Sequence, residues 1–178
     1  MIRHADPARD AAGCASVYAP YVLETAISFE KEPPGADELA RRISGVSERY
    51  PWLVAEEDGA VVGYAYGSAH GERAAYRWAA DVAVYVGQAF QRRGVGRALY
   101  DALLSLLVRQ GIHIACAGIT LPNNASVALH EACGFDLVGV YRRIGWKMGR
   151  WHDVGWWELE LQPPGDAPPA EVGPPARL

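Results

Sequence analysis

Residues 76–110 restrict the possible folds of this 178-residue chain more than any other stretch. The first part of this stretch, up to Val86, is rich in valine and alanine and reads as a β-strand. The last part, from Gly94, repeats leucine at helical spacing and reads as a long helix that ends at Gly111. The inward face of this helix is expected to carry Leu99, Leu103, Leu106 and Leu107. A strand that runs into a helix through a short glycine-containing loop predicts a mixed α/β domain.

The other predicted elements continue this mixed order. Asp6 followed by Pro7 is a helix start, and the apolar spacing continues to about Leu23. Asp58-Gly59 favours a tight hairpin between two β-type runs. The remaining helices are expected over 37–47 and 126–132, and the remaining strands before Asp6 and over 52–56, 61–66, 112–119, 135–141 and 154–161.

The length of the chain suits one domain with a single sizeable core, and we assign this domain to residues 1–162. From Pro163 the chain is rich in proline and glycine, and it has too little apolar surface to offset the entropy of ordering it. Residues 163–178 are therefore expected to form a disordered tail. A proline-rich ligand for a partner domain is the alternative.

The charge and the cysteines exclude several classes of protein. The formal charge is −4, without the basic excess that nucleic-acid binders carry. No apolar run reaches the roughly 20 residues that span a bilayer, and the N-terminus lacks a signal-like apolar core. Three widely separated cysteines indicate neither a disulfide framework nor a metal site. We expect a cytoplasmic protein with no nucleic-acid partner, no membrane segment and no metal.

The loop before the long helix has the composition of an anion-binding turn. Glycines at a helix start let an anion approach the unpaired backbone N–H groups. Here two glycines stand among three arginines, in the run Gln91-Arg92-Arg93-Gly94-Val95-Gly96-Arg97. A Rossmann fingerprint would need a third glycine in place of Leu99, and a Walker loop would need Gly-Lys followed by Ser or Thr. On glycine spacing alone, phosphate binding and a plain strand-to-helix turn both stay open.

Two segments of the chain resemble motifs of the GNAT superfamily of N-acetyltransferases. Residues 91–96 match its acyl-CoA motif Gln-x-x-Gly-x-Gly, and residues 123–135 resemble its downstream segment Asn-x-x-Ser-x-x-Leu-Tyr-Glu-x-x-Gly-Phe. Three more segments are similar to the phosphinothricin and methionine sulfoximine acetyltransferases of that superfamily, namely 50–56, 75–78 and 151–155. This narrower similarity spans about residues 1–162.

The resemblance implies an α/β fold with a mixed, mostly antiparallel and splayed central sheet and helices on both faces. It also implies acetyl-CoA as cosubstrate, direct attack in a ternary complex, a small amino-acid-like acceptor and a homodimer. Acceptors of the phosphinothricin, methionine sulfoximine or methionine sulfone type are expected from the subgroup. Two other functions stay open: an acyl-CoA-binding sensor without catalysis, and an acetyltransferase for peptide N-termini or aminoglycosides.

The same resemblance implies the residues that hold the cofactor. The backbone of Val84, Tyr85 and Val86 is expected to pair with the pantetheine arm like an added strand, and the run 91–97 is expected to wrap the pyrophosphate. Asn123 is expected to hydrogen-bond the pantetheine arm, with Asn124 as the alternative for that role. For either asparagine, an N-cap of the following helix is the structural alternative.

Acetyl transfer to an amine needs a neutral nitrogen, whereas an amine with a pKa near 8 or higher is mostly protonated at neutral pH. The resemblance points to Asp81 as the base, although the subgroup has the longer glutamate there. The shorter aspartate would need a bridging water or a closer substrate to reach the same proton. A solvated or salt-bridged strand carboxylate is the alternative. By the same resemblance, His130 stands where many relatives have tyrosine as a general acid, and its unperturbed pKa of about 6.5 suits proton transfer in either direction. It is expected to act as acid or base, alone or paired with Asp81, and an ordinary surface or core histidine is the alternative.

An amino-acid acceptor brings a carboxylate, for which a guanidinium is a matched two-pronged donor. By alignment with the subgroup, Arg73 is expected to hold this carboxylate, and Tyr76 and Phe29 are expected to line the substrate pocket. Gly71 stands where the subgroup has lysine. This difference favours methionine sulfoximine or sulfone over the doubly anionic phosphinothricin.

The residues of the C-terminal strands are interpreted as mainly structural. His152 and Asp153 are the weaker candidates for the site. Large aromatic side chains more often pack than react. The core and the dimer contact are therefore expected to contain Trp146, Trp151, Trp156 and Trp157.

Overall fold

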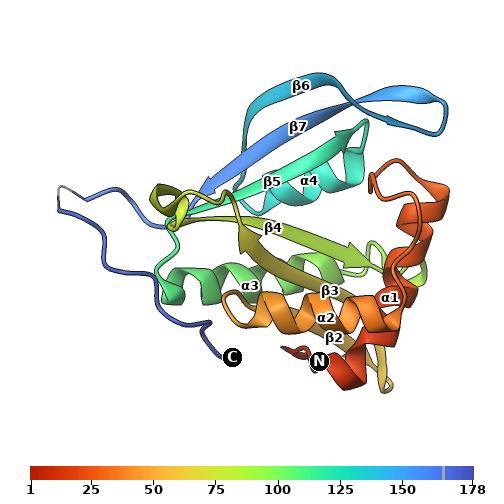
Figure 1. The fold of residues 1–178 in the computed structure, drawn as a ribbon, viewed down its shortest axis with the longest axis horizontal. Helices are drawn as coiled ribbons and strands as arrows, with labels where there is room; N and C mark the ends of the chain where they lie inside the picture. The colour runs from red at the N-terminus through yellow and green to blue at the C-terminus, as the bar shows by residue number, and fades with distance from the viewer. Residues whose placement is uncertain (166) are drawn as a thin grey trace.

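The computed structural model describes residues 1–165 and 167–178. A seven-stranded sheet runs through the molecule in the order β1-β2-β3-β4-β5-β7-β6, with helices on both faces (Figure 1). The strands are β1 (Ile2–His4), β2 (Trp52–Glu57), β3 (Ala60–Ala69), β4 (Ala79–Val86), β5 (Ile114–Leu121), β6 (Asp136–Lys147) and β7 (Arg150–Glu160). The helices are α1 (Pro7–Glu24), α2 (Ala36–Ser47), α3 (Val95–Gln110) and α4 (Asn124–Ala132), and two 3-10 turns, η1 (Ala74–Tyr76) and η2 (Gln88–Phe90), flank β4.

The pairing between β4 and β5 opens the sheet at its centre. Neighbouring strands of the described chain pair antiparallel except β4 and β5, which are parallel. This parallel ladder runs only from Ala79 with Ile114 to Asp81 with Cys116. Beyond it the two strands diverge, while β4 stays paired with β3 and β5 with β7. The structure thus confirms the mixed, mostly antiparallel and splayed sheet that the resemblance implied.

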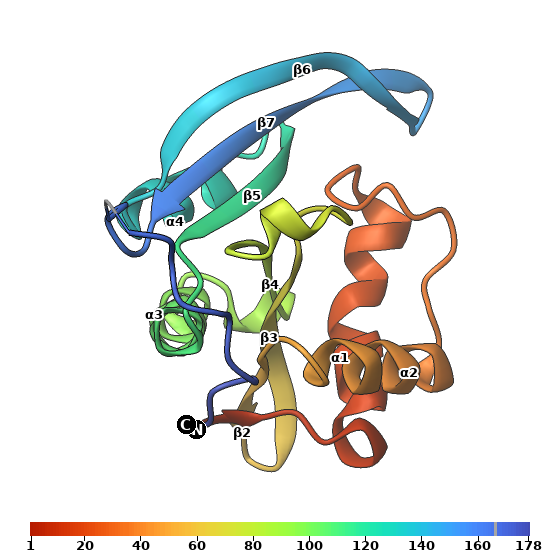
Figure 2. The same ribbon diagram turned by 60° about the vertical axis from the view of Figure 1, so that its left-hand side comes forward.

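Two apolar cores hold the helices against the sheet. α1 and α2 cover one face, where Leu39 and Ile43 are buried against Val54 and Tyr64. α3 lies on the opposite face (Figure 2). Its predicted inward face is confirmed, because the four leucines at positions 99, 103, 106 and 107 are at most 1 % exposed. Full burial of one leucine contributes about 1.5–3 kcal/mol, so this face alone is enough to fix α3 on the sheet.

The predicted start of α1 and the predicted end of α3 are both confirmed, and each is fixed by a helix cap. Asp6 Oδ1 accepts hydrogen bonds from the N–H groups of Ala8 and Arg9 at 2.9 and 3.2 Å, and Pro7 is the first residue of α1. Gly111 ends α3 with a φ of 95°, a left-handed conformation that suits glycine. Sequence reasoning located both ends because each cap is a local interaction.

The two closing strands extend further than their sequence pattern predicts. β6 continues past Tyr141 to Lys147, and β7 begins at Arg150. The turn between them consists of Met148 and Gly149, both at positive φ (52° and 74°). β6 is the edge strand and is exposed along almost its whole length. No alternation of buried and exposed residues therefore marks it in the sequence.

The β6–β7 hairpin is tied to the end of α1. Lys147 Nζ donates hydrogen bonds to the carbonyl oxygens of Val22 (2.6 Å) and Ser28 (2.7 Å). His152 is buried, and its Nε2–H donates to Lys147 O at 2.9 Å. Asp153 accepts a hydrogen bond from the N–H of Arg143 at 2.7 Å. The contacts of His152 and Asp153 therefore agree with the structural roles expected for them.

The prediction that residues 163–178 form a disordered tail stays a prediction. In the structure, the described part of this segment runs back along the molecule and makes contacts with it. Trp78 Nε1–H donates to Ala170 O at 2.8 Å, and the N–H of Gly173 donates to Gln110 O at 2.8 Å. No helix in the described ranges is long and apolar enough to cross a bilayer.

Candidate active site

Beyond Asp81 and Cys116, the diverging strands β4 and β5 border a cavity, which we call the β4–β5 cleft. The loop after α1 and the helices α3 and α4 complete its walls. The lining residues are Ile27, Val82, Ala83, Val84, Tyr85, Tyr100, Gly118, Ile119, Thr120, Asn123, Ser126 and His130. Four predicted site residues thus meet at one cavity, although up to 46 positions separate Val84 from His130 in the sequence.

The backbone of β4 offers hydrogen-bonding groups to this cleft. The N–H of Gly87 donates to Val62 O at 2.9 Å, which sets the alternation of the β3–β4 ladder. By that alternation Tyr85 directs its backbone groups toward β3, whereas Val84 and Val86 direct theirs toward β5. The backbone role expected for Val84 and Val86 therefore fits the geometry. The Tyr85 ring packs against Tyr18 and Tyr21 of α1 and Tyr64 of β3.

Tyr21 lies at the backbone edge of β4, and sequence reasoning did not select it. Its hydroxyl donates to Val86 O at 2.6 Å and lies 3.3 Å from Val86 N. Gln91 Nε2 donates to the same hydroxyl at 3.1 Å. Tyr21 is one aromatic residue on an ordinary helix face, and only the docking of α1 on the sheet brings it here. Val84 is left as the residue of this edge whose N–H faces the open cleft.

The start of α3 has the geometry of an anion site. Gly94 is the N-cap residue with a φ of 82°, and no side chain caps the helix there. A side chain at Gly94 would meet no atom within 4 Å, so this glycine is needed for its conformation. Gly96 has a different role, because a Cβ there would lie 3.2 Å from Leu129 Cδ2 of α4. The two glycines of the motif thus leave the first turn open and let α3 approach α4.

The three arginines of this turn differ in their partners. Arg93 pairs with Glu57 at 3.0 Å, and Arg97 pairs with Asp101 at 2.8 Å. Arg92, at a φ of 58°, has no ion-pair partner within residues 1–165 and 167–178. Its guanidinium is the one of the three that needs no exchange of partner to meet an anion at the helix start.

His130 is held inside the cleft by two hydrogen bonds. It is 4 % exposed, and its Nδ1–H donates to Ser126 O at 2.7 Å. Nε2 then accepts the hydroxyl proton of Tyr100 at 2.8 Å. Burial lowers the pKa of His130, so its imidazole is neutral at pH 7. Tyr100, which sequence reasoning counted only as part of the helix, is therefore the hydrogen-bond partner of His130 at Nε2.

Asn123 caps α4 and lines the cleft at the same time. Its Oδ1 accepts a hydrogen bond from the N–H of Ser126 at 3.2 Å, which is the N-cap role considered for it. Its side-chain NH2 has no hydrogen-bond partner within the described chain. The amide can therefore cap the helix with its oxygen and offer its nitrogen to a ligand.

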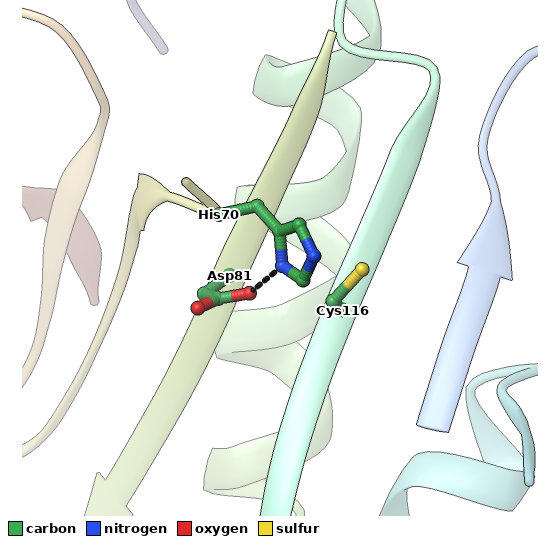
Figure 3. A group of neighbouring side chains, drawn as sticks. All are labelled: His70, Asp81 and Cys116. Atoms are coloured by element: carbon green, nitrogen blue, oxygen red, sulfur yellow. Dashed lines mark hydrogen bonds and ion pairs between the residues drawn. The ribbon is translucent and has the colours of Figure 1, made fainter. Parts of the chain in front are cut away.

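Asp81 lies at the closed end of the cleft, beside two residues that sequence reasoning did not select. Its Oδ1 is 2.7 Å from His70 Nδ1, and the polar atoms of Asp81, His70 and Cys116 lie within 4.8 Å of one another (Figure 3). Burial raises the pKa of Asp81, and the hydrogen bond with His70 offsets part of this effect. Because Asp81 bonds His70 and His130 bonds Tyr100, the two predicted catalytic residues do not form one pair.

The loop between β3 and β4 carries Arg73 and Tyr76. Arg73 is exposed and has no ion-pair partner in the part of the chain that the structure describes. The Tyr76 ring meets the His70 ring edge-on, with 5.6 Å between their centroids. A Cβ at Gly71 would lie 2.9 Å from Tyr76 Cδ2, so the glycine makes room for this ring. The loop therefore brings Tyr76 next to His70 of the Asp81 group, and it carries Arg73 as an exposed residue.

Phe29 lies at another part of the molecule's surface from these two residues. It packs on the β6–β7 hairpin, where a Cβ at Gly145 would overlap its ring. Its ring centroid is 6.3 Å from that of His152. The contacts of Phe29 thus connect it to the hairpin and not to Arg73 or Tyr76.

The fold and the cleft have counterparts among known proteins. Residues 2–156 match the acetyltransferase (GNAT) domain family. The phosphinothricin N-acetyltransferase of Streptomyces viridochromogenes is 40 % identical over 167 residues, which cover 94 % of this chain and 90 % of that protein. The L-methionine sulfoximine/L-methionine sulfone acetyltransferase of Salmonella typhimurium is 36 % identical, with coverage of 90 % and 94 %.

A solved structure agrees with the fold as well. The GNAT superfamily phosphinothricin acetyltransferase of Sinorhizobium meliloti, in complex with AcCoA, superimposes with a TM-score of 0.91 at 34 % identity, covering 98 % of this chain and 95 % of that one. The chain belongs to the GNAT family of acetyltransferases. The family and the enzymatic class indicated by residues 91–96 and 123–135 are thereby confirmed.

Proposed function

We propose that this acetyltransferase moves the acetyl group of acetyl-CoA to the amine of a small amino-acid-like substrate, of the phosphinothricin, methionine sulfoximine or methionine sulfone type. The observation that supports this most is the β4–β5 cleft with its free backbone edge at Val84. The uncapped start of α3 lies beside this edge, because a Cβ at Gly96 would be 3.6 Å from Val86 Cγ2 and 4.0 Å from Val84 Cγ2. The names of relatives that resemble this chain over nearly their whole length add support.

The donor side of the site uses backbone groups and one arginine. The pantetheine arm pairs with the edge of β4 at Val84, in the manner of an added strand. The pyrophosphate lies at the first turn of α3, where free N–H groups and the helix dipole favour an anion. Arg92 supplies the charge, and the side-chain nitrogen of Asn123 reaches the pantetheine arm. Val86 joins this pairing when the Tyr21 hydroxyl moves away from the Val86 backbone.

The reaction is a direct attack of the amine on the thioester in a ternary complex. A base at the hydrogen-bonded pair of Asp81 and His70 removes a proton from the substrate ammonium, and the N–H of Val84 stabilises the oxyanion that forms. The departing thiolate takes up a proton through the pair of His130 and Tyr100. Cys116 is no acyl carrier, because burial raises its pKa to about 11 and keeps it a thiol. Protein groups supply each step, so we propose that no metal takes part.

The acceptor lies against the loop between β3 and β4. Arg73 holds its carboxylate, and Tyr76 covers its apolar part. Gly71 lacks the second positive charge that a lysine would bring. We therefore propose that singly anionic acceptors, such as methionine sulfone and sulfoximine, are preferred over phosphinothricin.

The test follows thiol release from acetyl-CoA with a panel of acceptors. The panel contains methionine sulfone, methionine sulfoximine, phosphinothricin, a peptide with a free N-terminus and an aminoglycoside. We expect kcat/KM to be highest for the sulfone or sulfoximine and at least tenfold lower for the peptide and the aminoglycoside. Release only with the peptide or the aminoglycoside would overturn the acceptor class. No release with any acceptor, despite binding of acetyl-CoA, would overturn the proposed function.

We also propose that the enzyme works as a cytoplasmic homodimer. The edge strand β6 exposes a row of apolar side chains, among them Val138 (61 % exposed) and Tyr141 (59 %). An exposed apolar edge of this kind is usually covered by a partner. The three cysteines are free thiols in the structure, which suits a reducing compartment.

A further inference from the structure

His70 is hydrogen-bonded to the proposed base, Asp81. It follows β3 directly, and its ring lies over the point where β4 and β5 part (Figure 3). Nδ1 is 2.7 Å from Asp81 Oδ1, and Nε2 has no hydrogen-bond partner within residues 1–165 and 167–178. The imidazole therefore has one nitrogen fixed by the carboxylate and one nitrogen free.

The packing around His70 fixes the plane of its ring. The Tyr76 ring meets it edge-on at 5.6 Å, and the Trp156 ring meets it edge-on at 6.1 Å from β7. The side chains of His70 and Asp81 are 31 % and 32 % exposed, so both are reachable from the solvent side. A ring held by a carboxylate at Nδ1 and by two aromatic edges presents its Nε2 in one direction.

The distances favour a hydrogen-bonded pair over a metal site. Cys116 brings a third possible ligand, and the three polar atoms lie within 4.8 Å of one another. Two ligands of one tetrahedral Zn²⁺, each about 2.0–2.2 Å from the ion, lie about 3.3 Å apart. His70 Nδ1 and Asp81 Oδ1 are closer, at 2.7 Å, which is the length of a charge-assisted hydrogen bond.

We infer that His70 is the group that takes the proton from the substrate amine, and that Asp81 acts through it as a positioning residue. This inference rests on the proposed function and names the base of that reaction. It also explains how an aspartate can stand where the subgroup has the longer glutamate. The imidazole extends the reach of the carboxylate, so no bridging water is needed.

The reaction begins with proton transfer to the pair of His70 and Asp81. The substrate ammonium gives one proton to His70 Nε2, while Nδ1–H stays bonded to Asp81. The neutral amine attacks the thioester carbon, a C–N bond forms and the carbonyl becomes an oxyanion. The oxyanion then re-forms the carbonyl, and the C–S bond breaks. The nitrogen loses its second proton, the CoA thiolate takes up one proton, and CoA leaves as a thiol. His70 then releases its proton to water, and the enzyme returns to its starting state.

The charged and titratable groups around His70 come from four elements. Asp81 faces it from β4 and the Cys116 thiol from β5. Glu158 on β7 lies beside that thiol and contributes to raising its pKa. Tyr76 of the connecting loop presents its ring. The negative charge of Asp81 is therefore the main electrostatic influence on an imidazolium at this position.

The test compares His70→Gln, Asp81→Asn and the double variant with the unchanged enzyme. Glutamine keeps a donor for Asp81 but accepts no proton, so we expect kcat/KM for the amine to fall about 10²- to 10³-fold. In the pH profile of kcat/KM for His70→Gln, we expect the acidic limb to shift to lower pH by more than one pH unit, because carboxyl groups in general titrate below imidazoles. The kcat/KM of the double variant should be no lower than that of the less active single variant, because the two residues act as one unit.

The control variant is His113→Gln, a histidine at the start of β5 outside the cleft, which should keep both the rate and the pH profile. Binding of acetyl-CoA by each variant shows that the site is folded. If His70→Gln folds poorly, the unchanged enzyme supplies the measurement. Its lower limb should then show the strong temperature dependence of an imidazole ionisation, and a weak, carboxylate-like dependence would overturn the inference.

Three outcomes overturn the inference while leaving acetyl transfer intact. The first is a His70→Gln variant with the unchanged pH profile, whatever its rate. The second is additive losses in the double variant. The third is loss of activity on chelation that Zn²⁺ restores, since the three residues would then hold a metal. Failure of the proposed function differs from all three, because the unchanged enzyme would release no thiol.

Discussion

Asp81 and His130 were expected to handle protons, and each has a hydrogen-bond partner far away in the sequence. Asp81 is joined to His70, 11 positions away, and His130 to Tyr100, 30 positions away. In both pairs the predicted residue is hydrogen-bonded to a second ionisable group. At the scale of the residue, the chemistry of this site therefore depends on pairs and not on single side chains.

Arg73 is the residue on which the acceptor class depends. We predict that Arg73→Ala raises the KM of an amino-acid acceptor about 10- to 100-fold, since a hydrogen bond to a charged group contributes about 1.5–3 kcal/mol. The KM of acetyl-CoA should not change. The matched control is Arg77→Ala on the same loop, because the Arg77 guanidinium lies over the Trp78 ring at 4.0 Å and not at the site. Steady-state kinetics with both substrates decides, and an unchanged amino-acid KM removes Arg73 from the site.

The buried pair of Arg3 and Asp10 makes stability depend on pH. Burial alone raises the pKa of Asp10, but hydrogen bonds from Arg3 at 2.6 and 2.7 Å and the charges of Arg3 and Arg9 leave that pKa below its usual value. A carboxyl group with a lowered folded-state pKa stabilises the fold above its unfolded-state value of about 3.9, and this stabilisation is lost as the pH falls through the folded-state pKa.

We predict that Asp10→Asn lowers the free energy of unfolding at pH 7 by about 1.5–3 kcal/mol, because Arg3 keeps Glu56 as its partner. The difference from the unchanged protein should shrink below pH 4, as chemical denaturation at several pH values would measure. The control Arg41→Gln removes only an exposed pair and should change stability by less than about 1 kcal/mol. A constant difference down to acid pH would contradict the prediction.

At the scale of the element, the start of α3 lies beside the cleft edge of β4. β4 ends at Val86, a short turn follows, and α3 begins with an uncapped first turn. The two glycines of the motif act differently there, because Gly94 needs its positive φ and Gly96 lets α4 approach. The spacing of the motif therefore reflects a helix start and a helix–helix contact, both of which the cleft requires.

We predict that Gly94→Ala weakens acetyl-CoA binding about tenfold, because a left-handed alanine costs about 1–2 kcal/mol and the first turn relaxes away from its anion geometry. Gly59→Ala is the matched control, since Gly59 has a φ of 80° and equally open surroundings but lies in the β2–β3 hairpin. Both variants should lose similar stability, and only Gly94→Ala should lose affinity. Calorimetric titration with acetyl-CoA measures the affinity, and equal affinities for the two variants would contradict this role.

At the scale of the whole molecule, β6 leaves the sheet with an apolar edge. Trp146 and Trp151 lie in an edge-to-face pair at the end of the hairpin, both more than half exposed. Trp157 is buried in the core instead, and Trp156 covers Gly118 of β5. The four tryptophans therefore divide between the core and the surface at which we propose the dimer contact.

We predict that the unchanged enzyme sediments as a dimer and that the Val138→Glu/Tyr141→Glu variant sediments as a monomer. Stable interfaces bury about 1,200–2,000 Å², and two carboxylates in the centre of such a contact would be desolvated without partners. The control is Val108→Glu, an exposed apolar residue of α3 on another face. If the Val138→Glu/Tyr141→Glu variant remains a dimer, the dimer contact does not lie at β6. If the unchanged enzyme is a monomer, the proposed dimer is wrong.

The sequence by itself determined the family, the order of most elements and the place of the glycine turn before α3. These depend on local patterns: the N-cap at Asp6, the leucine spacing of α3 and the motif at Gln91–Gly96 need no knowledge of distant residues. The ends of β6 and β7 escaped prediction, because an exposed edge strand carries no alternation of burial. Local physics was sufficient wherever the interaction lies within a few residues along the chain.

Only the tertiary structure decided which residues meet at the reacting centre. The pairs of His70 with Asp81 and of Tyr100 with His130, and the hydroxyl of Tyr21 at β4, depend on how strands register and helices dock. Phe29 shows the same limit from the other side, since its contacts lie at the β6–β7 hairpin and not beside Arg73. The physical reason is that a hydrogen bond across elements is set by packing, and the sequence of either element carries no record of its partner.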